Sequence, residues 1–163
     1  MKSKKIMYLS QAAMIAALYV VLTLLANALG LANYAIQVRF SVALTILPFF
    51  TPAAFPALTI GCLLSNILTG CAPLDILFGT LATLMGTLGT YALRRFEWLA
   101  PLPPILANTI IVPWVLRFAY DIPDAIPYLM ATVGAGELIS CGLIGMLLLR
   151  SLKQIKKNLF KVN

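Results

Sequence analysis

The chain has 163 residues, of which 61% are hydrophobic and only 10% charged, and its mean hydropathy is +0.96. A soluble domain carries about 25% charged residues, so this composition excludes an ordinary soluble protein and indicates an integral membrane protein. The formal charge of +7 is gathered near the two termini, which is typical of membrane orientation rather than of a nucleic-acid-binding patch.

Apolar runs broken by proline, glycine and charge predict an all-α bundle of six transmembrane helices, forming a single integral membrane domain over residues 1–163. The predicted spans cover residues 8–29, 39–51, 55–70, 74–93, 101–120 and 128–149. The second and third spans are short, and the sequence TPAAFP between them predicts a turn followed by a helix start.

The basic residues predict the orientation of the bundle. An even number of spans puts both termini on one side, and lysines precede the first span while lysines and an arginine follow the last. Arg94 and Arg95, after the fourth span, fall on this same side. Because cytoplasmic loops carry an excess of lysine and arginine, we expect both termini inside and the protein in the bacterial cytoplasmic membrane.

The first span carries small residues at helical spacing. Ala12 and Ala16 are four residues apart, as are Ala13 and Ala17. Small residues at this spacing form a flat helix face that another helix can approach closely. The partner helix is either another protein or a helix of the same bundle, and the residues alone leave both open.

Polar and aromatic residues recur near the predicted outer face. The aromatic residues among them are explained either by an anchoring belt at the membrane interface or by ligand binding. Asp75, at the start of the fourth span, is also suited to capping that helix. The candidates for ligand binding in this region are Tyr34, Arg39, Asn66, Asp75 and Trp114.

The fourth span also carries a stripe of small residues. We expect this stripe to pack against a neighbouring helix. It consists of Gly79, Thr83, Gly86, Thr87 and Thr90.

The sixth span contains a carboxylate, Glu137, in an otherwise apolar stretch. At 1.5 Å per residue it lies about 15 Å below the outer end of its helix, and a charge at this depth is costly unless it is paired. Arg117 and Arg39 are both expected nearer the outer rim. Glu137 is therefore protonated, hydrogen-bonded to Asn108 of the fifth span or to a hydroxyl, or available to a ligand that donates hydrogen bonds.

The sequence argues against an enzyme and against a metal site. It contains no histidine, and its three cysteines, Cys62, Cys71 and Cys141, are far apart. It has no Walker loop and no nucleophile motif, so we expect no catalytic residues, no cofactor and no ATP hydrolysis by this chain itself.

Four segments resemble the QueT family of substrate-binding (S) components of energy-coupling factor (ECF) transporters. They are IQVRFSVALTILPFFTPAA, LDILFGTLATLMGTLGTY, WLAPLPPILANTIIV and VGAGELISC. The chain departs from the family pattern at Val42, where the resemblance implies an acid.

The resemblance implies a subunit that captures a queuosine precursor, a 7-deazaguanine such as the 7-aminomethyl compound, near the outer side of the membrane. It also implies a partner transmembrane coupling subunit and two cytoplasmic ATPases, with Ala12 and Ala16 on the docking surface beside Ala13 and Ala17. A guanine-like edge presents adjacent N–H donors that the carboxylate of Glu137 can accept.

Two other functions stay open from the sequence. One is a stand-alone secondary transporter of a small heteroaromatic solute, with Glu137 carrying a proton across the membrane. The other is a membrane scaffold without a small-molecule ligand, in which the alanine face of the first span is the active surface.

Overall fold

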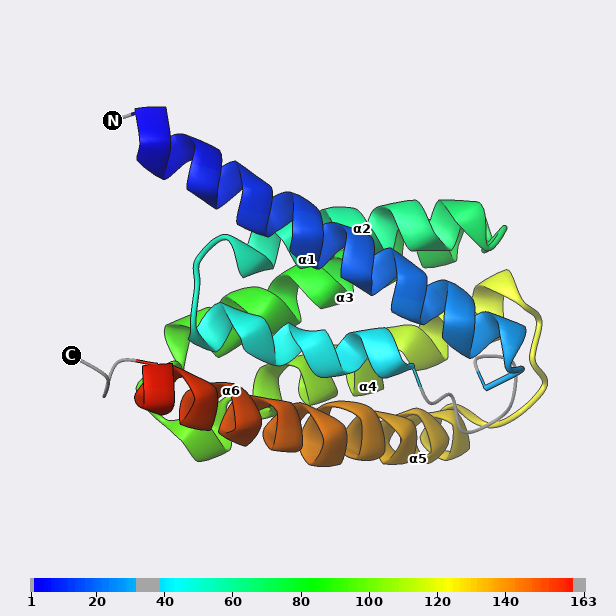
Figure 1. Cartoon of the computed structure of the whole chain (residues 1–163). Coiled ribbons are helices and arrows are strands. Elements are labelled where there is room, and N and C mark those ends of the chain that lie inside the picture. Colours follow the sequence, from blue (N-terminus) through cyan, green and yellow to red (C-terminus); the bar gives the residue numbers. More distant parts are fainter. Residues whose placement is uncertain (1, 32–38, 160–163) are drawn as a thin grey trace.

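The computed structural model describes residues 2–31 and 39–159, with side chains for residues 5–31 and 39–155, and the regular structure in this part of the chain is entirely helical (Figure 1). The prediction of an all-helical fold is confirmed, and each predicted apolar segment contains a helix. The helices are α1 (Lys2–Ala28), η1 (Phe40–Phe49), α2 (Ala54–Leu68), α3 (Pro73–Ala92), η2 (Glu97–Leu99), α4 (Leu102–Ala119), α5 (Ile126–Glu137), η3 (Leu138–Gly145) and α6 (Met146–Leu159).

Three helical stretches of the described chain are long and apolar enough to cross a membrane by length and composition, namely Lys5–Ala28, Glu97–Ala119 and Ile126–Ile155. The apolar helices η1 and α2 are shorter, with 10 and 15 residues. A 3₁₀-helix rises about 2 Å per residue and an α-helix about 1.5 Å. Both therefore measure roughly 20 Å, less than the ~30 Å hydrocarbon layer.

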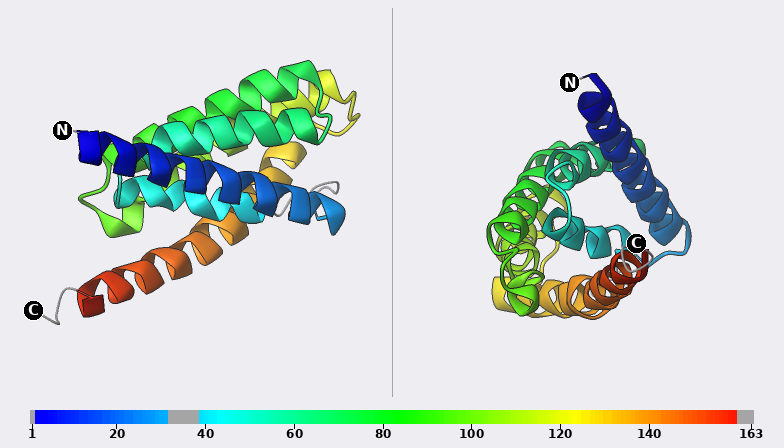
Figure 2. Two further views of the ribbon diagram at one scale, coloured as in Figure 1. Left: turned by 45° about the horizontal axis from the view of Figure 1, so that its top comes forward. Right: turned by 60° about the vertical axis from the view of Figure 1, so that its left-hand side comes forward.

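The short helix η1 lies inside the ring formed by the longer helices (Figure 2). Seven of its ten residues are buried, which agrees with its sequence, because a helix that is apolar on all sides belongs in a core. The two ends of the chain lie at the same end of the bundle, and η1 begins well short of the opposite end, where α1 finishes (Figure 1).

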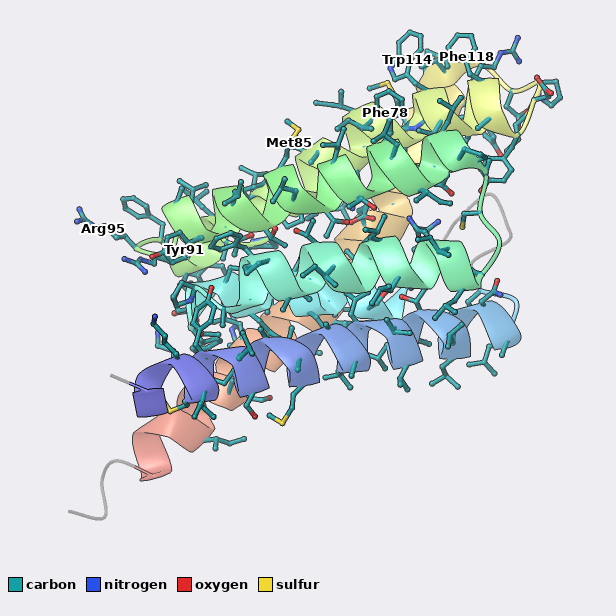
Figure 3. All side chains as sticks on the ribbon, turned by 90° about the horizontal axis from the view of Figure 1, so that it is seen from above. Phe78, Met85, Tyr91, Arg95, Trp114 and Phe118 are labelled. Atoms are coloured by element: carbon teal, nitrogen blue, oxygen red, sulfur yellow. The ribbon has the colours of Figure 1, made fainter. Side chains whose placement is uncertain are left out.

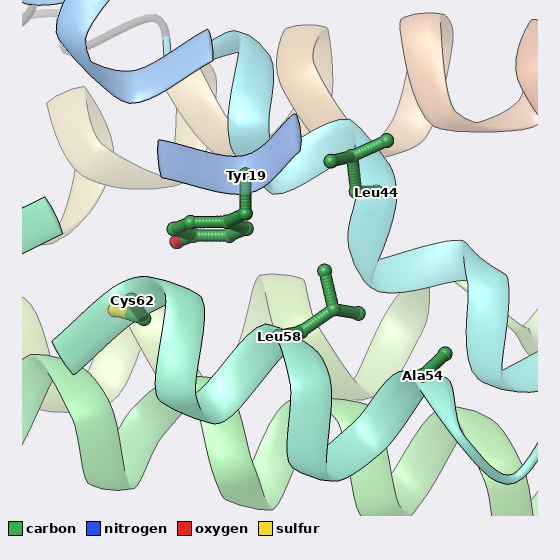
Figure 4. Close-up of a cluster of buried hydrophobic side chains, with 5 residues drawn as sticks. All are labelled: Tyr19, Leu44, Ala54, Leu58 and Cys62. Carbon is green, nitrogen blue, oxygen red and sulfur yellow. The ribbon is translucent and has the colours of Figure 1, made fainter. Parts of the chain in front are cut away.

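The contact between α1, η1 and α2 is a cluster of buried side chains (Figure 4). It contains Tyr19, Leu44, Ala54, Leu58 and Cys62. A glycine makes this approach possible, because a Cβ at Gly61 would lie 2.9 Å from the Cβ of Tyr19.

Helices α3 and α4 approach each other through glycines and prolines. A Cβ at Gly86 would lie 2.6 Å from the Cα of Pro104, and one at Gly89 would clash with the Cβ of Pro103. The hydroxyl of Thr90 donates to the carbonyl of Ala100 at 2.8 Å. The prediction that the small-residue stripe of the fourth segment packs against a neighbouring helix is confirmed.

Candidate ligand-binding site

Glu137 is buried in the bundle, with 8% of its surface exposed, and makes one hydrogen bond. The side-chain amide of Asn108 on α4 donates from Nδ2 to Oε1 of Glu137 at 3.0 Å. Oε2 is fully buried and has no hydrogen-bond partner among the described residues. Glu137 therefore retains a buried acceptor that protein atoms leave unsatisfied, and such groups are rare in folded proteins.

The backbone changes its hydrogen-bonding pattern at Glu137. The residue ends α5, and the π-helix η3 begins with Leu138, whose N–H reaches the carbonyls of both Ala135 and Gly134. A π-helical segment is uncommon and is often found at functional sites. Here it follows directly on the carboxylate, and η3 itself packs against η1.

A small inner cavity of about 20 Å³ lies beside Glu137. A buried water needs roughly 10–15 Å³, so the cavity has room for about one water molecule and not for an aromatic ring. Its wall includes Tyr19, Arg39, Val42, Cys62, Gly79, Thr83, Asn108 and Glu137. Val42, where the resemblance implies an acid, thus forms an apolar part of the wall.

A larger pocket of about 270 Å³, here called the outer pocket, is lined by residues at the ends of α1, α2 and α4 and at the start of α3. These helix ends lie at the end of the bundle opposite the termini (Figure 1). Small-molecule pockets usually measure about 300–1,000 Å³, so this one is of the size that a small heteroaromatic compound occupies. Its wall includes Thr23, Asn27, Arg39, Asn66, Thr69, Cys71, Asp75, Leu116 and Tyr120.

Asp75 and Asn66 meet at this outer pocket, and both are buried. A Cβ at Gly79 would lie 3.1 Å from Oδ1 of Asp75 and 3.3 Å from Nδ2 of Asn66, so both polar atoms border the space that Gly79 leaves open. Oδ2 of Asp75 accepts a hydrogen bond from the hydroxyl of Tyr120 at 2.8 Å. The N-cap residue of α3 is Ala72, and no side chain caps this helix. The alternative prediction that Asp75 caps the helix is therefore wrong.

Arg39 lines both the inner cavity and the outer pocket. Oε2 of Glu137 nevertheless has no partner among the described residues, which agrees with the expectation that Arg39 does not pair with this carboxylate. Arg39 immediately precedes η1, which begins well short of the end of the bundle where α1 finishes (Figure 1).

The structure does not bring Trp114 to these cavities. Its side chain is 50% exposed and stacks on Phe118, with ring centroids 6.2 Å apart. Figure 3 shows both rings pointing away from the bundle, on the outer side of α3 and α4. They border an apolar groove with Phe78, as expected of side chains that face lipid.

Arg117 is also exposed, and its guanidinium donates to the carbonyl of Ile122 at 2.9 Å. Tyr34 lies outside the described residues.

The four alanines of α1 divide between two environments. Ala13 and Ala17 are exposed, whereas Ala12 and Ala16 are half-buried. The backbone oxygen of Ala16 would lie 3.1 Å from a Cβ at Gly61, so this part of α1 packs on α2. Ala12 and Ala16 therefore lie on the face of α1 that packs within the bundle, and Ala13 and Ala17 lie on an adjacent face that is open.

Sequence analysis did not place Tyr120 among the binding residues, although its hydroxyl holds Asp75 and accepts from the N–H of Ala72 at 3.2 Å. Its position at the outer end of α4 is that of an interfacial anchor, which conceals this role. The one signal that could suggest the pairing of Tyr120 with Asp75 is that both residues are predicted at the same end of the bundle.

Comparison with known proteins identifies a family. Residues 9–154 match the model of the family described as QueT transporter. A curated relative, the queuosine precursor transporter QueT of Lactococcus lactis subsp. cremoris (strain MG1363), is 36% identical over 98 residues. That alignment covers 60% of this chain and 57% of the relative, so it spans little more than half of the relative's length. No solved structure matches the chain.

Proposed function

This chain belongs to the QueT transporter family, and we propose that it is the ligand-capturing S component of an ECF-type importer. The proposed ligand is a queuosine precursor, a 7-deazaguanine such as the 7-aminomethyl compound, taken from the outer side of the membrane. The observation that carries the proposal is the buried Oε2 of Glu137, an acceptor with no partner among the described residues, next to a cavity.

Glu137 is proposed to accept the donor edge of the ligand. The 2-amino group and ring N–H of a deazaguanine lie side by side, and a carboxylate accepts such a pair with two parallel hydrogen bonds. Asn108 holds Oε1 at 3.0 Å and so fixes the orientation of the carboxylate before the ligand arrives. Pairing with the ligand would remove the cost of leaving Oε2 unsatisfied, which is about 1–3 kcal/mol for a buried polar atom.

Asp75 is proposed to receive the ammonium of the aminomethyl group. Its Oδ2 is held by Tyr120 at 2.8 Å, and its Oδ1 borders the space above Gly79. Asn66, which shares this space, is proposed to contact the ring of the ligand. Since the outer pocket alone has about 270 Å³ and the inner cavity about 20 Å³, the ligand is proposed to occupy the outer pocket with its donor edge directed inward to Glu137.

The whole chain is proposed to form one membrane domain with six spans and both termini in the cytoplasm. The two ends of the chain share one end of the bundle (Figure 1), and the basic residues Arg94, Arg95 and Arg150 belong to segments at this same end. The positive-inside rule then assigns that end to the cytoplasm. The outer pocket, at the opposite end, faces the outside in this orientation.

A partner transmembrane subunit and two cytoplasmic ATPases are proposed to drive transport, because the chain has no motif for ATP hydrolysis. The exposed alanines, Ala13 and Ala17, provide a flat stripe on α1 for the partner helix. The half-buried Ala12 and Ala16 lie at the edge of this stripe and join it to α2.

Direct binding to the purified chain tests the proposal. Titration with 7-aminomethyl-7-deazaguanine should give saturable binding, whereas adenine, which lacks the adjacent donor pair of guanine, should not bind. Mass spectrometry of small molecules retained after gentle purification identifies the ligand independently. The absence of binding to any deazaguanine would contradict the assignment.

Reconstitution distinguishes the two alternative functions. Uptake into proteoliposomes that contain this chain and no ATPase would indicate a proton-coupled secondary transporter, and the S-component proposal expects no uptake there. A scaffold would bind no small molecule and would tolerate substitution of Glu137.

A further inference from the structure

We propose that the end of the bundle at which both termini lie carries a binding site for the headgroup of an acidic phospholipid. The site consists of three arginines, Arg94, Arg95 and Arg150, here called the arginine patch, together with the exposed rings of Phe96 and Trp98. It lies at the opposite end of the bundle from the outer pocket, so the inference goes beyond the proposed function and does not depend on which ligand that pocket takes.

The arginine patch is formed by two segments that meet at this end of the bundle. Arg94 and Arg95 follow α3, in the turn that leads to η2, and Arg150 lies on α6. Figure 3 shows the side chain of Arg95 projecting beyond the helices at this end. The guanidinium of Arg150 lies over the ring of Trp98 in η2, 5.1 Å from its centroid. This contact places the third arginine beside the turn that carries the other two.

The positive charge of the arginine patch is not neutralised by the protein. All three arginines are exposed. The nearest acid along the chain, Glu97, forms a salt bridge with Lys153 instead, and this is the only salt bridge in the ranges whose side chains the structure describes. The patch therefore offers its three guanidinium groups to an anion from outside the chain.

Aromatic rings orient two of these guanidinium groups. That of Arg94 lies 4.3 Å from the centroid of the Tyr91 ring, and that of Arg150 lies over Trp98. A guanidinium that lies over a ring is attracted by the face of the ring and keeps its N–H donors at its own edge. Donors arranged in this way bind the oxygens of a phosphate group in pairs.

The exposed rings favour a lipid over a soluble anion. Phe96 is 59% exposed and Trp98 76%, and Leu99 and Leu102 beside them are also exposed. Aromatic residues are enriched where a membrane protein crosses the interface between lipid and water, and basic residues near that surface attract acidic lipids. A phospholipid contacts the arginines through its phosphate and the rings through its acyl chains, whereas a free phosphate contacts the arginines alone.

The arginine patch and the alanine stripe of α1 lie on different helices. Helix α1 packs against α2 and η1, whereas the patch belongs to the end of α3 and to α6, which pack mainly against α4 and α2 and against η3 and η1. A partner helix seated on Ala13 and Ala17 thus meets a different part of the bundle. This arrangement favours lipid, rather than the partner subunit, as the occupant of the patch.

Lipid binding to the full chain in a neutral detergent tests the inference. The variant Arg94→Gln/Arg95→Gln/Arg150→Gln is compared with the wild type and with Arg117→Gln, which removes an exposed arginine at the opposite end of the bundle. Native mass spectrometry measures the retention of phosphatidylglycerol and of zwitterionic phosphatidylcholine.

We expect the wild type and Arg117→Gln to prefer phosphatidylglycerol. The apparent affinity for this lipid should fall about fivefold for each arginine removed from the patch. The triple variant should unfold near the wild-type temperature without lipid, because its three side chains are exposed and form no salt bridge. Equal retention of both lipids by the wild type, or an undiminished preference in the triple variant, would overturn the site.

A second experiment distinguishes the source of the anion. Phosphatidylglycerol should raise the unfolding temperature of the wild type more than that of the triple variant, and inorganic phosphate at equal ionic strength should not. An equal rise with inorganic phosphate would assign the patch to a soluble anion and overturn the lipid site. Loss of co-purification with the coupling subunit in the triple variant, with lipid retention unchanged, would assign the patch to a protein partner instead.

Discussion

Nδ2 of Asn108 donates to Oε1 of Glu137 at 3.0 Å, and the second carboxylate oxygen has no partner among the described residues. The pair connects α4 to the junction of α5 and η3, 29 residues further along the chain. One oxygen is fixed by protein, and the other borders a cavity that Arg39 also lines. One oxygen of the carboxylate is thus oriented by a hydrogen bond, and the other is an acceptor that the described residues leave unsatisfied.

Asn108→Leu should disturb both stability and binding. The substitution removes the donor and leaves both oxygens of Glu137 without a described partner, a cost of about 1–3 kcal/mol per buried polar atom. We expect a lower unfolding temperature and weaker ligand binding, measured by thermal unfolding and titration in detergent. Asn108→Asp would be worse, because it places two carboxylates in contact. An unaltered unfolding temperature in Asn108→Leu would show that the hydrogen bond contributes nothing.

Asp75→Asn should separate cationic from neutral ligands. Asparagine keeps an oxygen that can accept from Tyr120, so the geometry of the pocket is retained while the negative charge is lost. Hydrogen bonds to charged groups contribute about 1.5–3 kcal/mol, so affinity for the aminomethyl compound should fall roughly ten- to a hundredfold. Affinity for the neutral 7-cyano analogue should stay nearly constant. An equal loss for both compounds would mean that Asp75 does not meet the ammonium.

Gly86→Ala should destabilise the contact between α3 and α4. The new Cβ would lie 2.6 Å from the Cα of Pro104, and this backbone atom cannot move aside cheaply. Overpacking of this kind costs about 1–3 kcal/mol. Gly142→Ala is the matched control, because the nearest atoms to its Cβ are side-chain carbons at 3.8 and 3.9 Å. Thermal unfolding should show a clear loss for the first variant and little change for the second; equal behaviour would contradict the close approach.

Ala17→Leu should block assembly without affecting ligand capture. Ala17 is exposed on α1, so a larger side chain there fits the isolated chain but prevents close approach of a second helix. Co-purification with the coupling subunit and the ATPases should be lost, and deazaguanine binding should be unchanged. Met14→Leu, on an exposed position of the same helix, is the control and should assemble normally. Assembly of Ala17→Leu at wild-type levels would exclude this stripe as the docking surface.

Much of the fold could be predicted from the sequence, because apolar length and proline positions determine where helices begin and end in a chain of this composition. The predicted segment 74–93, for example, corresponds to α3 (Pro73–Ala92). The helix types could not be predicted. Neither the 3₁₀ geometry of η1 nor the π-helical turn after Glu137 has a signal in the spacing of apolar residues, since both depend on packing against neighbouring helices.

The candidate site could be predicted only in part. The sequence predicts Asn108 as one partner for Glu137, because a buried amide and a buried acid on neighbouring helices satisfy each other. The place of Arg39 at both cavities could not be predicted, because depth counted along the chain assumes that every helix begins at the membrane surface, and η1 does not reach the end of the bundle where α1 finishes (Figure 1). The direction of Trp114 could not be determined either, because α4 is apolar on most of its surface and its rotation is set by Gly86, Gly89 and the prolines opposite them.

The most direct test of the account is the affinity of Glu137→Gln for 7-aminomethyl-7-deazaguanine, measured by titration beside the wild type and Trp114→Ala. Glutamine keeps the size of the side chain and an oxygen for Asn108, but it turns the second position into an N–H donor that faces the donors of the ligand. The account predicts a loss of more than about tenfold, or ~1.4 kcal/mol, in Glu137→Gln and no change in Trp114→Ala. Wild-type affinity in Glu137→Gln would contradict it.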